Sequence, residues 1–175
     1  MRLDAIGYVI KKPGTSCFFV EPEIYGFVDW ITRIAKSYNI ALLPEVHADI
    51  TTANKLADRG HFIYDFVTPY MVLDLMINKN KADFIKYLEN RPHRQFTMLD
   101  CHDGVPVIPD LNGLYNAENA RKVAETCAQN GAQFSRILSE EHKGAGGFDV
   151  HQINGTYYSL LGEDDNAYAR AWCVM

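Results

Sequence analysis

Apolar and polar residues alternate with two different periods along the first hundred positions. Short apolar or β-branched runs predict strands at residues 2–9, 40–46, 61–66 and 95–101. Between the first two runs, apolar residues recur every three or four positions, which is the pattern of an amphipathic helix. Its apolar positions are Ile24, Phe27, Val28, Ile31, Ile34, Ala35 and Tyr38.

Helical patterns also separate the later strands. Residues 50–59 follow the second predicted strand, and residues 70–78 and 81–89 follow the third. Strands that alternate with helices in strict order favour a parallel sheet with right-handed crossovers. The first hundred residues therefore predict an α/β fold.

The pattern changes after Gly104. The next fifty or so residues contain one predicted helix, 117–129, and the glycine-rich segment "HKGAGG", but no further strand of the earlier type. A segment this long is typical of an insertion, and long loops after strands often carry function. The final residues, "DDNAYARAWCVM", predict the beginning of another helix.

Composition and charge exclude several classes of protein. The chain has 175 residues, of which 47% are hydrophobic, so it can bury the core of a soluble domain. Its formal net charge of −5 argues against a nucleic-acid partner, because such proteins usually carry a basic surface. The first residues do not show the charged segment and apolar run of a secretory leader, and no apolar run approaches the roughly 20 residues of a membrane span. We therefore expect no membrane partner and a cytoplasmic location.

The four cysteines are widely spaced and form no CxxC pair. This spacing indicates neither a zinc site nor a disulfide framework. We expect all four to be buried free thiols and expect no bound metal. They are Cys17, Cys101, Cys127 and Cys173.

Polar residues recur where the predicted strands end. Asp4, Glu45, His102 and Asp103 lie within or just after the C-terminal ends of three strands, where α/β proteins gather catalytic groups. Each acid alone could instead cap a helix or hold a loop. Three carboxylates that converge would suit a retaining glycosidase, in which one carboxylate is ionised and a second is protonated.

Several motifs together resemble one known family. "RLDAIGY", "LLPEVH" and "LDCHDG", in this order, resemble the nucleophile, acid/base and transition-state-stabiliser motifs of the α-amylase clan, glycoside hydrolase family 13. "KKPGTSCFFVEPEIY", "YDFVTPY" and "VHQINGTYYSLLGEDD" are similar to its sucrose phosphorylase subfamily. The resemblance covers nearly the whole chain.

The resemblance implies a role for each strand-end residue. Asp4 would be the nucleophile, Glu45 the general acid/base and Asp103 the group that stabilises the transition state. Arg2 would hold Asp4 ionised, because a neighbouring cation lowers a carboxylate pKa. His102 would donate to glucose hydroxyls, although it could instead be a histidine satisfied within the core.

The resemblance also implies a fold and domain boundaries. Members of this family have a (β/α)8 TIM barrel, of which this chain would hold strands four to seven. Residues 1–103 would be half of the catalytic barrel, 104–160 an acceptor-loop insertion after the last strand present, and 161–175 the start of a truncated barrel helix. An internal start or a shortened reading frame would explain this layout. Open sheet edges would then favour a homodimer or another association.

The insertion bears on the acceptor. In the subfamily, the segment matching "FDVHQING" forms a mobile acceptor loop; Asp149 and Gln152 match it, and His151 replaces a tyrosine. A histidine can donate from both nitrogens, which suits a phosphate on the acceptor sugar. We therefore favour sucrose 6'-phosphate over sucrose, with glucosylglycerol-type acceptors as a further alternative. His151 could instead be a solvated loop residue.

Two functions of different classes follow. The first is a glycosyltransferase, a retaining α-glucoside phosphorylase that uses inorganic phosphate as co-substrate and no cofactor. The second is a non-catalytic truncated chain. A hydrolase of the same clan is a variant of the first, because three carboxylates alone do not decide whether phosphate or water resolves the intermediate.

Overall fold

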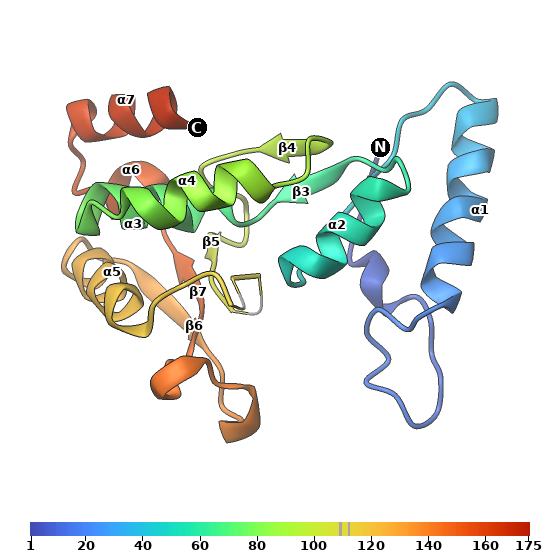
Figure 1. Cartoon of the computed structure of the whole chain (residues 1–175), viewed down its shortest axis with the longest axis horizontal. Coiled ribbons are helices and arrows are strands. Elements are labelled where there is room, and N and C mark those ends of the chain that lie inside the picture. The colour runs from blue at the N-terminus through green and yellow to red at the C-terminus, as the bar shows by residue number, and fades with distance from the viewer. Residues whose placement is uncertain (109, 112) are drawn as a thin grey trace. The chain divides into compact units, whose positions relative to one another are not determined.

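The computed structural model describes residues 1–108, 110–111 and 113–175 (Figure 1). The chain divides into two compact units, which we describe separately. The first unit comprises Met1–Tyr64 and Pro92–Phe96, and the second comprises Asp65–Arg91 and Thr97–Met175. No helix among the described residues is long and apolar enough to cross a membrane.

The first unit begins with a very short parallel strand pair. β1 (Arg2–Leu3) pairs with β2 (Leu43–Pro44). The first strand ends early because Ala5 adopts a left-handed conformation with φ of 45°, after which a 3-10 helix runs over Ile6–Tyr8. The prediction of a strand over residues 2–9 is therefore wrong beyond its first two residues.

Two helices cover this strand pair and supply most of the core. α1 (Glu23–Ser37) and α2 (Ile50–Asp58) confirm the predicted helices. The Asp49 carboxylate caps α2 by accepting from the backbone N–H groups of Thr51 and Thr52 at 2.8 and 3.2 Å. The buried core consists of Ile6, Ile24, Tyr25, Val28, Leu56, Ala57 and Ile63.

The boundary between the two units falls within two further strands. β3 (Ile63–Asp65) pairs with β4 (Gln95–Thr97). Both are shorter than the predicted strands at 61–66 and 95–101. Phe62, which directly precedes β3, and Phe96, within β4, are 39% and 54% exposed, and their ring centroids lie 5.5 Å apart.

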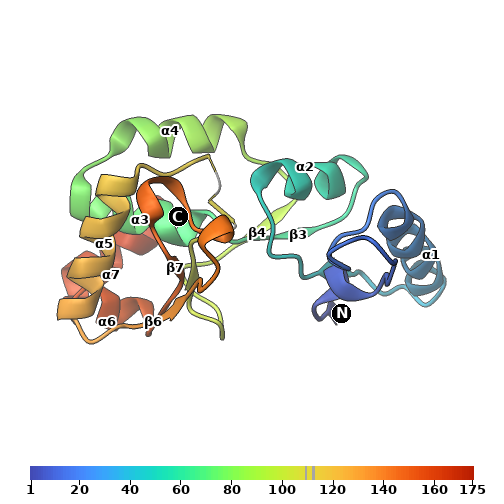
Figure 2. The same ribbon diagram turned by 90° about the horizontal axis from the view of Figure 1, so that it is seen from below.

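The second unit is built around one central helix. α3 (Thr68–Asn78) contacts α4, α5, α7 and the strand β5 (Val105–Pro106), and its residues from Thr68 to Asp74 are all buried (Figures 1 and 2). A helix that is apolar on all sides is expected at the centre of a core. The helices around it are α4 (Lys81–Asn90), α5 (Ala117–Gln129), α6 (Tyr157–Leu160) and α7 (Asp165–Val174).

A three-stranded antiparallel sheet lies in the segment where no further strand was predicted. Its order is β5 (Val105–Pro106), β7 (Val150–Asn154) and β6 (Gln133–Arg136). Two 3-10 helices, Glu140–His142 and Ala145–Gly147, connect β6 to β7. The expectation of a segment without strands is therefore wrong. The predicted helix at 117–129 is confirmed.

The structure has the predicted α/β character. It contains a parallel pair, an antiparallel sheet and helices between the strands. The predicted boundaries at residues 103 and 160 remain predictions, since the two compact units divide the chain along different lines.

Candidate functional site

Two of the predicted acids and the predicted arginine lie together in the first unit. Arg2 is the first residue of β1 and pairs in register with Leu43 of β2. Asp4 directly follows β1, and Glu45 directly follows β2. The parallel register therefore places both acids at the C-terminal ends of neighbouring strands.

Arg2 bridges the two carboxylates. Its Nη2 lies 2.9 Å from Oδ1 of Asp4 and 2.5 Å from Oε1 of Glu45. The two oxygens therefore lie no farther apart than the sum of these distances, which is below the roughly 5.5 Å carboxyl spacing of retaining glycosidases. The geometry is compatible with a retaining carboxylate pair.

Glu45 is buried, but its pKa lies below the ordinary value for a glutamic acid. Burial alone would raise its pKa, yet hydrogen bonds from Arg2 Nη2 and from the backbone N–H of Ala5, at 2.5 and 3.1 Å, outweigh burial and lower the pKa. Arg2 was expected to act on Asp4, but its shorter contact is with Glu45. A general acid must carry a proton, so Glu45 is held here in the form of a general base.

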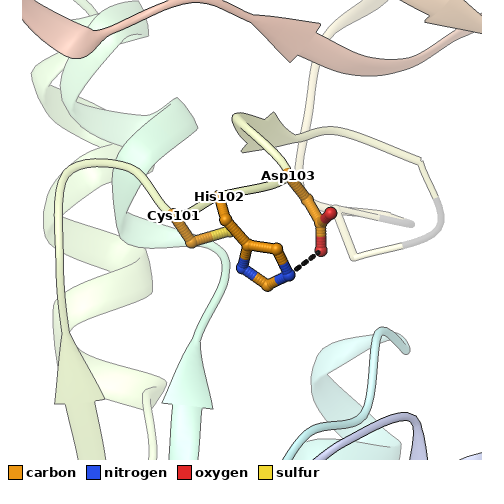
Figure 3. A group of neighbouring side chains, drawn as sticks. All are labelled: Cys101, His102 and Asp103. Atoms are coloured by element: carbon orange, nitrogen blue, oxygen red, sulfur yellow. Dashed lines mark ion pairs between the residues drawn. The ribbon is translucent and has the colours of Figure 1, made fainter.

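His102 and Asp103 lie in a tight turn of the second unit (Figure 3). The turn is closed where Gly104 N donates to Cys101 O at 2.9 Å and Cys101 N donates to Gly104 O at 3.4 Å. His102 Nε2 lies 3.4 Å from Oδ2 of Asp103. The side chain of His102 is 63% exposed, so the alternative of a core histidine is wrong.

The three predicted acceptor residues lie on or beside β7. His151 sits at a β-bulge, because Ser135 pairs with Gln152 while Arg136 pairs with Val150. The carbonyl of His151 accepts from Val107 N at 2.9 Å. The side chain is half-buried in a strand, so the alternative of a solvated loop residue is also wrong.

Asp149 forms an ion pair with Arg136, which sequence analysis did not predict as a site residue. Arg136 Nη1 lies 2.6 Å from Asp149 Oδ1 across the two strands. No local pattern marks Arg136, because its role depends on the pairing of β6 with β7. Gln152 lies opposite both Ser135 and Pro106 in the same sheet.

The cysteines are free thiols, but only one of them is buried. Cys127 is buried, Cys17 and Cys101 are half-buried, and Cys173 is exposed. Burial raises the pKa of Cys127 to about 12. The expectation of four buried thiols is therefore wrong for three positions. One of these three, Cys101, lies next to His102 and Asp103 in the same turn.

Comparison with known proteins gives relatives over almost the whole chain, although no family model matches it. Sucrose 6(F)-phosphate phosphorylase of Thermoanaerobacterium thermosaccharolyticum is 57% identical over 99% of this chain and 36% of its own length. Sucrose phosphorylase of Streptococcus mutans is 37% identical, over 96% of this chain and 34% of its own length. Glucosylglycerol phosphorylase of Marinobacter adhaerens is 32% identical, over 99% of this chain and 36% of its own length.

A solved structure agrees with these sequences. The crystal structure of sucrose 6F-phosphate phosphorylase from Thermoanaerobacter thermosaccharolyticum is similar with a TM-score of 0.94 and 57% identity, covering 99% of this chain and 35% of that one. Every relative named above is a phosphorylase. The chain belongs to the sucrose phosphorylase subfamily and spans about a third of the length of these relatives.

Proposed function

We propose that the chain is part of a retaining α-glucoside phosphorylase that transfers glucose from sucrose 6'-phosphate or sucrose to inorganic phosphate. The observation that carries the proposal is 57% identity over 99% of the chain to a sucrose 6(F)-phosphate phosphorylase. The arginine-bridged pair of Asp4 and Glu45 supports it, because a retaining mechanism needs two closely spaced carboxyl groups.

In the proposed reaction, Asp4 attacks the anomeric carbon and the bond from that carbon to the fructosyl oxygen breaks. Glu45 gives its proton to the departing oxygen, so the product is fructose or fructose 6-phosphate and a β-glucosyl ester of Asp4. Phosphate then attacks the same carbon, Glu45 takes a proton from it, and Asp4 leaves as a carboxylate. Two inversions give α-glucose 1-phosphate.

Glu45 must gain a proton before the first step. Its contact with Arg2 opposes this, because the cation favours the ionised form. We infer that Arg2 shifts towards Asp4 when substrate binds, which would leave Glu45 buried and more readily protonated. Asp103 and His102 would bind the sugar hydroxyls.

The proposed fold of the whole enzyme is a (β/α)8 barrel, with β1 to β4 as strands four to seven. The parallel β1–β2 pair with α1 between its strands supports this assignment. Inorganic phosphate is the proposed co-substrate, with no cofactor, and the cytoplasm is the proposed location. The exposed pair of Phe62 and Phe96 supports association of the isolated chain through its open sheet edges, as a homodimer.

The proposed acceptor is phosphorylated, on the strength of His151. A β-bulge turns a side chain out of the regular alternation of its strand, and bulges are frequent beside active sites. A protonated imidazole at this position would pair with the 6'-phosphate of the acceptor. We therefore favour sucrose 6'-phosphate over sucrose.

A chimera tests the proposal. The chain would replace the matching segment of the 57% identical Thermoanaerobacterium enzyme, and release of glucose 1-phosphate would be measured on both sugars. We expect the chimera to be active, Asp4→Asn to abolish turnover and Asp58→Asn, an exposed control, to leave it unchanged. His151→Tyr should raise the ratio of activity on sucrose to activity on sucrose 6'-phosphate.

Two results would contradict parts of the proposal. Turnover that survives Asp4→Asn in an active chimera would remove Asp4 as nucleophile. An unchanged substrate ratio in His151→Tyr would remove His151 from the acceptor site and leave the glucosyl transfer standing.

A further inference from the structure

Three side chains of types that can bind a metal ion lie on one turn of the second unit. Cys101, His102 and Asp103 each offer one donor atom, and the thiol sulfur, imidazole nitrogen and carboxylate oxygen all lie within 4.8 Å of one another. Figure 3 shows the three side chains on the same stretch of backbone. They belong to one unit and to one turn, so their mutual geometry depends on local structure alone.

The backbone of this turn is fixed at both ends. Two backbone hydrogen bonds join Cys101 and Gly104. Gly104 has φ of +83°, and a Cβ atom there would collide with the carbonyl oxygen of Ile153 in β7. Only glycine fits this position without strain, so the turn is anchored against the sheet and presents its three side chains in a restricted arrangement.

The spacing and chemistry of the donors suit zinc. With bonds of roughly 2.0 to 2.3 Å, neighbouring ligands of a tetrahedral zinc ion lie about 3.3 to 3.8 Å apart. His102 Nε2 and Asp103 Oδ2 already lie 3.4 Å apart. A thiolate and an imidazole favour zinc over magnesium or calcium, which prefer oxygen ligands.

We propose that the turn formed by residues 101–104 is a zinc-binding site in which Cys101, His102 and Asp103 are the ligands. Binding breaks the S–H bond of Cys101, whose proton passes to solvent, and replaces the 3.5 Å contact from Sγ to Gly104 O with a sulfur–zinc bond. The exposed side chain of His102 leaves the fourth position open to water.

Zinc bound here would inhibit the enzyme. This consequence rests on the proposed function, in which His102 and Asp103 bind sugar hydroxyls. Zinc would occupy the atoms that the sugar needs, so a chelator should restore activity. The binding itself is independent of that function and is tested without an activity assay.

The test is a titration of the reduced 175-residue chain with Co²⁺, followed by displacement with Zn²⁺. We expect a thiolate-to-cobalt charge-transfer band that zinc removes at one ion per chain. Cys101→Ser should abolish the band, and Asp103→Asn should weaken the affinity by more than about tenfold, since even residues that only orient ligands contribute that much.

Matched variants control for other sites. Cys173→Ser removes an exposed thiol elsewhere, and His142→Gln removes a histidine paired with a carboxylate, Glu141, at 3.6 Å. Both should keep the band. In the unsubstituted chain, zinc should also protect Cys101, and not Cys173, from alkylation as read by peptide mass spectrometry.

The proposal fails if the unsubstituted chain gives no charge-transfer band at millimolar cobalt, or if Cys101→Ser keeps it. Equal alkylation of Cys101 with and without zinc would contradict it independently of whether any variant folds.

Discussion

The two units hold their charged groups in contrasting ways. In the second unit, the carboxylate of Asp65 is fully buried, accepts hydrogen bonds from Thr68 and Tyr87 and pairs with Arg91. In the first unit, Asp4 is 75% exposed, and one arginine serves both Asp4 and Glu45. A buried carboxylate with several fixed partners stabilises structure, whereas two acids that share one cation can exchange protons and partners. The proposed function gives chemistry to Asp4 and Glu45 in the first unit, whereas the buried network gives Asp65 in the second unit a structural role.

The network around Asp65 gives the largest expected effect. The backbone N–H and hydroxyl of Thr68 donate to it at 2.9 and 2.6 Å, the Tyr87 hydroxyl donates at 2.6 Å, and Arg91 lies 3.6 Å away. Asp65→Asn removes the charge and turns one acceptor into a donor, which leaves a half-buried Arg91 without its counter-charge. We expect a loss of about 3 to 5 kcal/mol in the free energy of unfolding, measured by urea titration.

The exposed Asp58→Asn is the control for this change, and it should alter stability by less than about 0.5 kcal/mol. Hydrogen exchange should show lost protection in α3 and α4 first. A loss below about 1 kcal/mol for Asp65→Asn would show that the buried carboxylate is not structural.

Sequence analysis located the helices better than the strands. Helical periodicity extends over ten or more residues, and Asn116 caps α5 by accepting from Glu118 N and Asn119 N, so its start can be recognised locally. The strands at 105–106, 133–136 and 150–154 are short, and polar residues interrupt the apolar ones in the last two. Their stability comes from pairing between distant segments, which no local pattern records.

The same distinction applies to the candidate site. Asp4 and Glu45 could be selected because "RLDAIGY" and "LLPEVH" resemble motifs of one family and each acid lies within a predicted strand. Which acid receives the shorter contact from Arg2 depends on the register of β1 against β2, so the lowered pKa of Glu45 could not be predicted. The pairing of Arg136 with Asp149 likewise required the structure.

Arg2→Met should give an intermediate effect that depends on pH. The pKa of Glu45 is lowered in the folded chain, so its ion pair stabilises the fold fully above its ordinary value of 4.5 and loses this contribution as pH falls through the folded-state pKa. Without Arg2, burial of Glu45 is offset less, because the hydrogen bond from Ala5 N remains but the cation is lost. We therefore expect the slope of stability against pH below 4.5 to flatten in urea titrations.

Lys12→Met is the matched control, because Lys12 pairs with Glu23 at 2.5 Å and lowers the pKa of that carboxyl too. Glu23 is 40% exposed and solvent screens it, so this change should alter the slope less. Equal slopes in Arg2→Met and the parent chain would contradict the role given to the bridge.

The smallest effect on stability is expected for Arg136→Gln. This variant tests whether Asp149, also in the second unit, is a structural carboxylate like Asp65. Arg136 is 53% exposed, so loss of its pair with Asp149 should cost less than about 1 kcal/mol in the free energy of unfolding. Because Ile137 N still donates to the Asp149 carbonyl at 2.7 Å, the strand pairing should survive while the carboxylate becomes free. Chemical shifts separate these two effects. The shift of the Asp149 carboxyl carbon should change strongly, whereas the shift of the Ile137 amide should stay nearly the same. If both change together and stability falls by several kcal/mol, Asp149 is a structural residue like Asp65, and its place in the acceptor site is lost.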